Sequence, residues 1–362
     1  MGQTWHVMSG QVVPAANKSI LGIFNGAGSG VVVTIKRIWV RGNESVTAIA
    51  GIVDDFSIIR LSDLVIGSGG AVVPVTYDST NAAIPGQLVM FQTGTATEIA
   101  TPNLYGRVVR ASEEQVTPMV GNWNTWCNHP WLSLALDIGY GDQVNGANQA
   151  EGIVLREGEG VHVKNVTGTV GFVEAWIEFD IGAPVASADT YIAAFVGVTW
   201  ASVNKYIASL LNGSGSGKVL RIKKIWALNN QIAGVTGVLM QAEVKIVSAH
   251  AAGTAASILC TDTAGAAVPG QVTAYYASAT VTDVENILRF MFSSDEPAVT
   301  TATSDELQCI YPLNILYDCY GDAGVQPLTL REGQGVAIKV IWASGAYAGL
   351  VDTFVEFTMA AS

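Results

Sequence analysis

Charged residues are scarce in this chain of 362 residues. Asp, Glu, Lys and Arg make up 13% of it, whereas a soluble domain is typically about a quarter charged. Hydrophobic residues make up 49%, yet no apolar run approaches the roughly 18 residues that a membrane helix needs. We therefore expect no membrane partner, and we expect other subunits to cover much of the apolar surface.

Positive charge and cysteine are scarce as well. Lys and Arg number 18 against 30 Asp and Glu, which gives a net charge of −12. A nucleic-acid surface needs clustered Lys and Arg, so we expect no nucleic-acid partner. The 4 cysteines form no CxxC pair and do not match between the two halves of the chain. We expect buried free thiols rather than a disulfide framework.

Sequence motifs for catalysis are absent. There is no GxSxG, no HExxH and no P-loop, and no two of the 4 histidines have the spacing of metal ligands. His162 has no counterpart in the second half and is predicted to face solvent. A hydrolase would need two carboxylates in one cleft, but Glu113 and Glu114 are adjacent and would point to opposite faces of a strand. We expect neither an enzyme nor a cofactor.

What the chain does contain is a duplication. LREGEGVHVK at 155–164 returns as LREGQGVAIK at 330–339. NKSILGIFNGAGSGVVVTIKRIWV at 17–40 matches NKYIASLLNGSGSGKVLRIKKIWA at 204–227 at more than half of its positions. AAIPGQ at 82–87 matches AAVPGQ at 266–271, and the matches keep the same order in both halves. The chain is therefore predicted to hold two copies of one module.

The pattern of each copy predicts β-strands. Apolar and polar residues alternate in FVEAWIEF, and Gly, Asn, Asp and Pro turns separate many short runs of this kind. Such a pattern favours an all-β fold with two tandem homologous β-sandwich domains of the jelly-roll type. We place the first copy at 1–183, a linker at 184–190 and the second copy at 191–362.

A few charged residues recur in both copies. Paired carboxylates near loops can hold Ca²⁺, although solvated turn residues are the more common case. Arg156–Glu157 and Arg331–Glu332 recur beside a turn and could form local salt bridges; both arginines are also interface candidates. The weak calcium candidates are Asp142, Asp322, Glu113, Glu114, Asp295 and Glu296.

Two tryptophans also recur. Trp39 and Trp226 each lie near the end of a Lys-bearing strand. A tryptophan in a strand packs in a core or an interface more often than it binds a sugar ring. We regard both residues as interface candidates.

Several motifs together resemble a known group of proteins. NGAGSGVVVTIKRIW with NGSGSGKVLRIKKIW, the SSDEP turn at 293–297, PLNILYDCYGD at 312–322 and the LREG turns are similar to small β-sandwich proteins encoded among the structural genes of tailed bacteriophages. The resemblance covers most of each half, although the first copy has ASEEQ in place of SSDEP. It implies a head decoration or other capsid-associated protein without catalytic residues.

These observations lead to one expected function and two alternatives. We expect a non-catalytic virion structural protein that coats or decorates a symmetric lattice. A double jelly-roll major capsid protein stays open, as does a bivalent carbohydrate-binding or adhesion protein with exposed aromatic residues at equivalent positions. The expected partners are further copies of the chain, as a trimer or larger, and other virion proteins such as a major capsid protein. The expected location is the virion.

Overall fold

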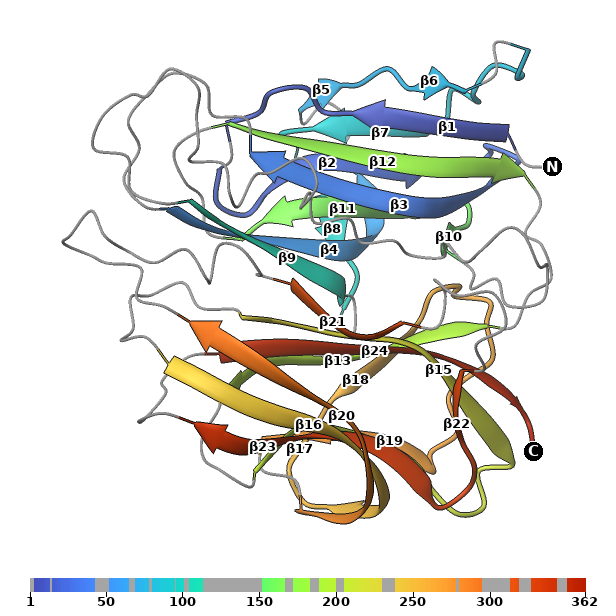
Figure 1. The fold of residues 1–362 in the computed structure, drawn as a ribbon. Helices are drawn as coiled ribbons and strands as arrows, with labels where there is room; N and C mark the ends of the chain where they lie inside the picture. Colours follow the sequence, from blue (N-terminus) through green and yellow to red (C-terminus); the bar gives the residue numbers. More distant parts are fainter. Residues whose placement is uncertain are drawn as a thin grey trace, which may run out of the picture. The chain divides into compact units, whose positions relative to one another are not determined.

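The computed structural model shows a chain built from β-strands (Figure 1). It describes residues 3–13, 15–42, 52–64, 69–77, 80–94, 96–100, 104–112, 152–166, 172–182, 189–199, 205–229, 238–277, 280–294, 313–318, 327–343 and 350–362. Among these residues no helix is long and apolar enough to cross a membrane. The strands fall into two compact units: unit 1 holds β1 to β12 together with the segment Thr261–Thr263, and unit 2 holds β13 to β24.

Unit 1 consists of two antiparallel sheets. Sheet A has the strand order β10-β3-β12-β1-β6, and sheet B has the order β5-β7-β2-β11-β4-β8 with β9 also paired to β4. The strands are β1 Gln3–Met8, β2 Lys18–Asn25, β3 Val32–Gly42, β4 Ile52–Leu64, β5 Gly70–Ala71, β6 Val75–Thr76, β7 Leu88–Gln92, β8 Ala96–Glu98, β9 Leu104–Ser112, β10 Ile153–Leu155, β11 Glu159–Asn165 and β12 Val173–Gly182.

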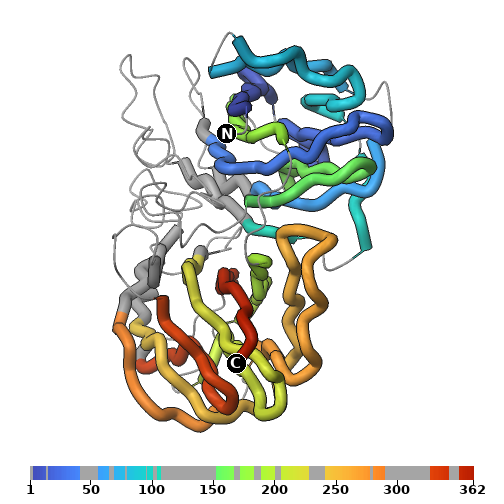
Figure 2. Tube along the Cα trace, turned by 90° about the vertical axis from the view of Figure 1, so that its right-hand side faces the viewer, coloured from blue at the N-terminus to red at the C-terminus, as the bar shows by residue number. Residues whose placement is uncertain are grey.

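Unit 2 also consists of two antiparallel sheets, whose chain trace can be followed in Figure 2. Sheet C has the order β18-β13-β24-β15-β21 with β22 also paired to β15, and sheet D has the order β17-β19-β14-β23-β16-β20. The strands are β13 Thr190–Thr199, β14 Tyr206–Asn212, β15 Lys218–Asn229, β16 Val238–Ala251, β17 Thr254–Ala255, β18 Ser257–Cys260, β19 Val272–Tyr276, β20 Thr280–Ser294, β21 Leu313–Asp318, β22 Leu328–Leu330, β23 Gln334–Ala343 and β24 Leu350–Ala361.

The two units share one topology. In unit 1 the strands β1-β12-β3-β10 lie side by side in one sheet and β2-β11-β4-β9 in the other; unit 2 repeats these orders as β13-β24-β15-β22 and β14-β23-β16-β20. Two four-stranded sheets in these orders form a jelly roll. The all-β prediction of two tandem homologous β-sandwiches is therefore confirmed. The predicted domain bounds stay a prediction; the structure ends β12 at Gly182 and begins β13 at Thr190.

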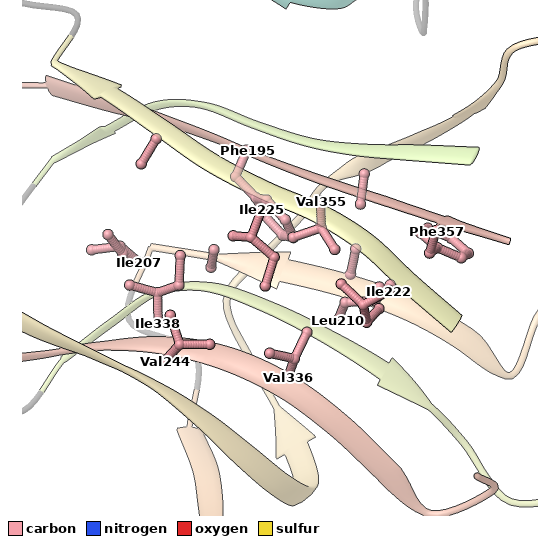
Figure 3. Packing of buried hydrophobic residues seen from close by; sticks show 14 of the residues in the cluster. Phe195, Ile207, Leu210, Ile222, Ile225, Val244, Val336, Ile338, Val355 and Phe357 are labelled. Atoms are coloured by element: carbon pink, nitrogen blue, oxygen red, sulfur yellow. The ribbon is translucent and has the colours of Figure 1, made fainter. Parts of the chain in front are cut away.

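A buried apolar core lies between the sheets of each unit, and Figure 3 shows that of unit 2. Alternate residues of β24, Val351, Val355 and Phe357, pack against residues of sheet D such as Leu210 and Val336. This arrangement follows from the period of two in a strand, which sends alternate side chains to one face. Burial of each such side chain contributes about 1.5–3 kcal/mol.

The repeated glycine-rich motifs form a lock between two connections that cross from sheet to sheet. In unit 1, Asn25 at the end of β2 donates from Nδ2 to the carbonyl oxygens of Val31, at 2.9 Å, and Leu155, at 3.1 Å. The amide of Gly158 donates to the Asn25 carbonyl at 2.6 Å. Gly158 has a φ of 82°, a left-handed conformation that favours glycine. The β2–β3 and β10–β11 connections are thus held together.

Unit 2 repeats this lock. Asn212 donates from Nδ2 to the carbonyls of Lys218, at 2.7 Å, and Leu330, at 3.1 Å, while the amide of Gly333 donates to the Asn212 carbonyl at 2.7 Å. The lock explains why NGxGSG and LREG were both retained after duplication, since each motif supplies half of the same set of hydrogen bonds.

Candidate functional site

The connection from β10 to β11, residues 155–160, holds an ion-paired arginine; we call this segment the first arginine turn. Arg156 donates from Nε and Nη2 to the two carboxylate oxygens of Asp262, at 2.9 and 2.7 Å. The Asp262 side chain is 8% exposed and that of Arg156 is 36% exposed. A bidentate pair of this kind fixes the carboxylate in both position and orientation.

The partner of the first arginine turn is the segment Thr261–Thr263, which belongs to unit 1. The amide of Val154 donates to the carbonyl of Thr261 at 3.0 Å, so the segment lies against the edge of β10. Thr263 donates from Oγ1 to Glu159 at 2.6 Å. One backbone hydrogen bond, the bidentate ion pair and the Thr263–Glu159 hydrogen bond together hold this segment against the turn.

The second arginine turn, residues 330–335, has the same framework. Gln334 Oε1 accepts the Arg331 amide at 2.9 Å, as Glu159 Oε2 accepts the Arg156 amide at 2.8 Å in the first turn. Arg331 is exposed, and no carboxylate pairs with its guanidinium among the residues that the structure describes. The second turn therefore presents the same arginine without a partner from the described part of the chain.

The local Arg–Glu salt bridges considered from the sequence are absent from the described contacts of both turns. Glu157 accepts the amides of Gly28 and Gly30 at 3.1 and 2.7 Å. These two hydrogen bonds lower the pKa of Glu157 below its usual value, with Gly30 the larger cause. Glu332 accepts the amides of Gly215 and Gly217 in the same way, at 2.9 and 2.7 Å.

A buried arginine beneath the first turn was not predicted. Arg60 on β4 is 1% exposed and donates to Tyr105 Oη at 2.5 Å and to Glu159 at 2.6 Å. The pairing of Arg60 with Val161, and of Ile246 with Val336, places Ile246 at the equivalent position of unit 2.

The residues that bind Arg60 in unit 1 are also replaced in unit 2. Tyr105 and Ile287 each lie at the same β-bulge of their sheets, and Gln334 stands where the first copy has Glu159. Unit 1 therefore carries an ionic network where unit 2 carries apolar side chains and a neutral amide.

A serine, a histidine and a carboxylate come together on sheet B. Ser19 Oγ lies 2.7 Å from His162 Nδ1, and His162 Nε2 lies 3.7 Å from a Glu98 carboxylate oxygen. Lys164 Nζ lies 2.7 Å from the same oxygen. His162 is 3% exposed, so the prediction that it faces solvent is wrong. No sequence motif pointed to this group, because its members come from three separate strands.

This group has the residue types of a hydrolytic triad but not the geometry. The Ser19 side chain is buried at 1% exposure, so a substrate has no access to its hydroxyl. Burial, and secondarily the charge of Lys164, lowers the pKa of His162 to about 3. A base this weak cannot accept a serine proton near neutral pH. Ser19 and His162 share one hydrogen bond, His162 Nε2 is buried without a hydrogen-bond partner among the described residues, and the group supports no nucleophilic step.

In unit 2, a tyrosine and not a histidine lies beside the equivalent carboxylate. Tyr206, at the position of Ser19, donates its hydroxyl to Asp283, and Lys339 Nζ lies 3.0 Å from Asp283. Ala337 stands in place of His162 and belongs to the same buried cluster as the Tyr206 ring. The single Tyr206 side chain in unit 2 thus takes the place of Ser19 and His162 in unit 1.

The two tryptophans lie in different surroundings. Trp226 is 1% exposed and stacks on Phe354 with ring centroids 5.2 Å apart. Trp39 is half-buried, lies opposite Trp176 and carries the Arg37 guanidinium 4.9 Å from its ring centre. Equivalent exposed aromatic residues, which the bivalent carbohydrate-binding alternative requires, are therefore not found at this pair.

The calcium candidates cannot be placed. Asp142, Asp322, Glu113, Glu114, Asp295 and Glu296 all lie outside the described residues. Within the described ranges, no three His, Cys, Asp or Glu side chains are grouped closely enough to hold a metal ion.

Comparisons with known proteins give little guidance. No family model and no curated protein matches the chain. A solved structure of PNGase F, a glycosylasparaginase from Flavobacterium meningosepticum, is similar with a TM-score of 0.34 and 10% sequence identity, over 98% of this chain and 96% of that chain. A likeness this weak assigns no activity to this chain.

Two predictions are nevertheless corrected by this comparison. We expected a coat or decoration protein of a virion, with a major capsid protein or a bivalent carbohydrate-binding protein as alternatives, and we expected no enzyme. The protein found to be similar is an enzyme, and none of the comparisons supports a capsid role. Both predictions are withdrawn. The resemblance to phage proteins, the virion location and the expected partners stay untested predictions.

Proposed function

We propose that the chain is a self-associating protein that binds further copies of itself through the second arginine turn. The observation that carries this proposal is the contrast between two equivalent turns. In the first, Arg156 holds a carboxylate in a bidentate pair. In the second, Arg331 is exposed on an equally ordered framework.

The second turn keeps the frame on which the first turn holds its carboxylate. Leu328–Leu330 of β22 pairs with β15, as the equivalent strand β10 pairs with β3. A hydrogen bond between a charged arginine and a carboxylate contributes about 1.5–3 kcal/mol.

The composition of the chain agrees with association. Only 13% of the residues are charged while 49% are hydrophobic. Val73 and Val75 are 82% and 54% exposed beside the edge of sheet A, and Tyr77 is 62% exposed. Exposed apolar residues gathered at one edge are typical of surfaces that bind other proteins.

Sedimentation velocity over a wide range of concentrations tests the proposal. The native chain should form a reversible oligomer, and Arg331→Glu should weaken it strongly. Lys205→Glu is the matched control, because Lys205 is also an exposed cation of the second copy and the change in charge is the same. A native chain that stays monomeric, or an Arg331→Glu variant that associates like the native chain, would refute the proposal.

A further inference from the structure

We infer that the second arginine turn is specific for a segment in which one acidic residue directly follows another. This inference rests on the proposed function and specifies the chemistry of the segment that the turn binds. The first arginine turn provides the template, because the structure shows it holding the segment Thr261–Thr263. One residue that differs between the two turns changes the hydrogen bonds that the second can make.

Two side-chain contacts define what the first turn selects. Arg156 binds the carboxylate of Asp262 through Nε and Nη2, at 2.9 and 2.7 Å. Thr263, the next residue, donates from Oγ1 to Glu159 Oε1 at 2.6 Å. The first turn therefore fits an acidic residue followed by a hydrogen-bond donor.

The two turns have the same internal hydrogen bonds. The amide of Glu159 donates to the Arg156 carbonyl at 3.1 Å, and that of Gln334 donates to the Arg331 carbonyl at 3.0 Å. The side chains bend back in the same way: Glu159 Oε2 accepts the Arg156 amide at 2.8 Å, and Gln334 Oε1 accepts the Arg331 amide at 2.9 Å. The ends of these two side chains therefore occupy equivalent positions.

The second turn presents a donor where the first presents an acceptor. Because Oε1 of Gln334 accepts the Arg331 amide, its Nε2 takes the position that Oε1 has in Glu159. Gln334 is exposed, and no described residue accepts a hydrogen bond from its Nε2. An amide nitrogen donates and cannot accept. The group that meets it, in the place of the Thr263 hydroxyl, must therefore be an acceptor.

A carboxylate is the strongest acceptor for this position. A hydroxyl group can also accept, but a hydrogen bond to an ionised acceptor is roughly twice as strong as a neutral one. In the first turn a carboxylate there would face the carboxylate of Glu159, and like charges repel. The chain has 30 Asp and Glu residues against 18 Lys and Arg, so its copies are rich in the residues that the second turn selects.

Two peptides that differ in one residue test this specificity. Gly-Thr-Asp-Asp-Gly and Gly-Thr-Asp-Thr-Gly, blocked at both ends and carrying the same neutral dye, are titrated with the chain and followed by fluorescence anisotropy. The native chain should bind the Asp-Asp peptide roughly five-fold more tightly, since a charged hydrogen bond replaces a neutral one. The first turn does not compete, because Arg156 already holds Asp262.

Variants assign the preference to the second turn. Gln334→Glu keeps an acceptor for the Arg331 amide but replaces Nε2 by a charged oxygen, so it should reverse the order of the two peptides. Arg331→Glu should bind neither peptide. Gln11→Glu makes the same chemical change at an exposed glutamine of the first copy and should behave like the native chain.

The outcomes separate this inference from the proposed function. A native chain that binds neither peptide, or binds the Asp-Thr peptide as tightly as the other, overturns the inference. So does a Gln334→Glu variant that keeps the native order. The proposed function is decided separately by sedimentation velocity: it stands if the native chain associates and Arg331→Glu does not, whatever the peptides do. A native chain that stays monomeric but prefers the Asp-Asp peptide refutes self-association and supports the specificity.

Discussion

The two copies share one backbone framework, but the side chains at equivalent positions of it differ in charge and size. Beneath the arginine turns, unit 1 has Arg60, Tyr105 and Glu159, and unit 2 has Ile246, Ile287 and Gln334. The differences are concerted: where a charge is lost, its partners are lost with it. This is expected if one partner of a buried ion pair is costly to keep without the other.

The outer faces of sheets B and D show a second concerted difference. Ser19 and His162 in unit 1 correspond to Tyr206 and Ala337 in unit 2. In both units a hydroxyl group, a carboxylate and a lysine end in the same place. What the duplication preserved is therefore the pairing of a carboxylate with a lysine rather than the identity of the residues around that pair.

The largest effect is expected from breaking the ionic network of unit 1. Arg60→Ile removes the guanidinium from Glu159 and Tyr105 and should lower the free energy of unfolding by about 3–5 kcal/mol. The triple change Arg60→Ile, Tyr105→Ile and Glu159→Gln installs the residues of unit 2 and should restore most of the loss. Urea unfolding measures both variants. A triple variant no more stable than the single one would refute the idea that the three residues act as a set.

A smaller effect is expected at His162. His162→Ala leaves a cavity and removes the partner of the buried Ser19 hydroxyl, so it should cost about 2–3 kcal/mol. Adding Ser19→Tyr reproduces the solution of unit 2 and should recover most of this loss, as measured by urea unfolding. As a reciprocal control, Ala337→His should destabilise unit 2, because the Tyr206 ring already fills that space. Equal stability of the single and double variants would contradict the interpretation.

The histidines also predict how stability depends on pH. Burial lowers the pKa of His162 to about 3 and that of His250 to about 4, below the usual 6.5. The unfolded chain therefore binds more protons than the folded chain below pH 6.5. The free energy of unfolding should be greatest above this pH and fall by up to about 1.4 kcal/mol per pH unit for each histidine as the pH decreases.

The Ser19→Tyr, His162→Ala variant isolates the contribution of His162. Its free energy of unfolding should fall less steeply than that of the native chain between pH 6.5 and pH 5, a range above the titration of most carboxylates. Urea unfolding at a series of pH values measures the slope. Identical slopes for the two proteins would show that His162 binds as many protons in the folded state as in the unfolded state.

The smallest effect is expected where the copies are most alike. Glu157→Gln and Glu332→Gln each replace a carboxylate that accepts two glycine amides by a side chain with one oxygen. Amide exchange should accelerate at Gly28 or Gly30 in the first variant and at Gly215 or Gly217 in the second, with little change in global stability. A clear effect in one copy and none in the other would show that the two locks are not equivalent.

The sequence predicted the framework well because the framework follows from local patterns. Alternation and turn residues indicated strands, and the repeated NGxGSG and LREG motifs indicated turns, which the structure links through Asn25 and Glu157. These features are short in sequence and occur twice. The strand orders could not be read from the pattern, since partners far apart along the chain are selected by packing.

The polar networks could not be predicted from the sequence, because their members are far apart along the chain. Arg60 and Glu159 are 99 residues apart, and Ser19 and His162 are 143 residues apart. Comparison of the copies even argued against His162, because its equivalent is Ala337. A residue that is exchanged together with its partner leaves no trace in a search for identical positions.

The lock between the two crossing connections has a mechanical consequence. Asn25 and Glu157 in unit 1, and Asn212 and Glu332 in unit 2, tie together two connections at one end of each sandwich. Under a pulling force that separates the sheets, that end acts as a hinge, because several hydrogen bonds must break there at once. The two sheets of each jelly roll should therefore separate first at the end that lies opposite these hydrogen bonds.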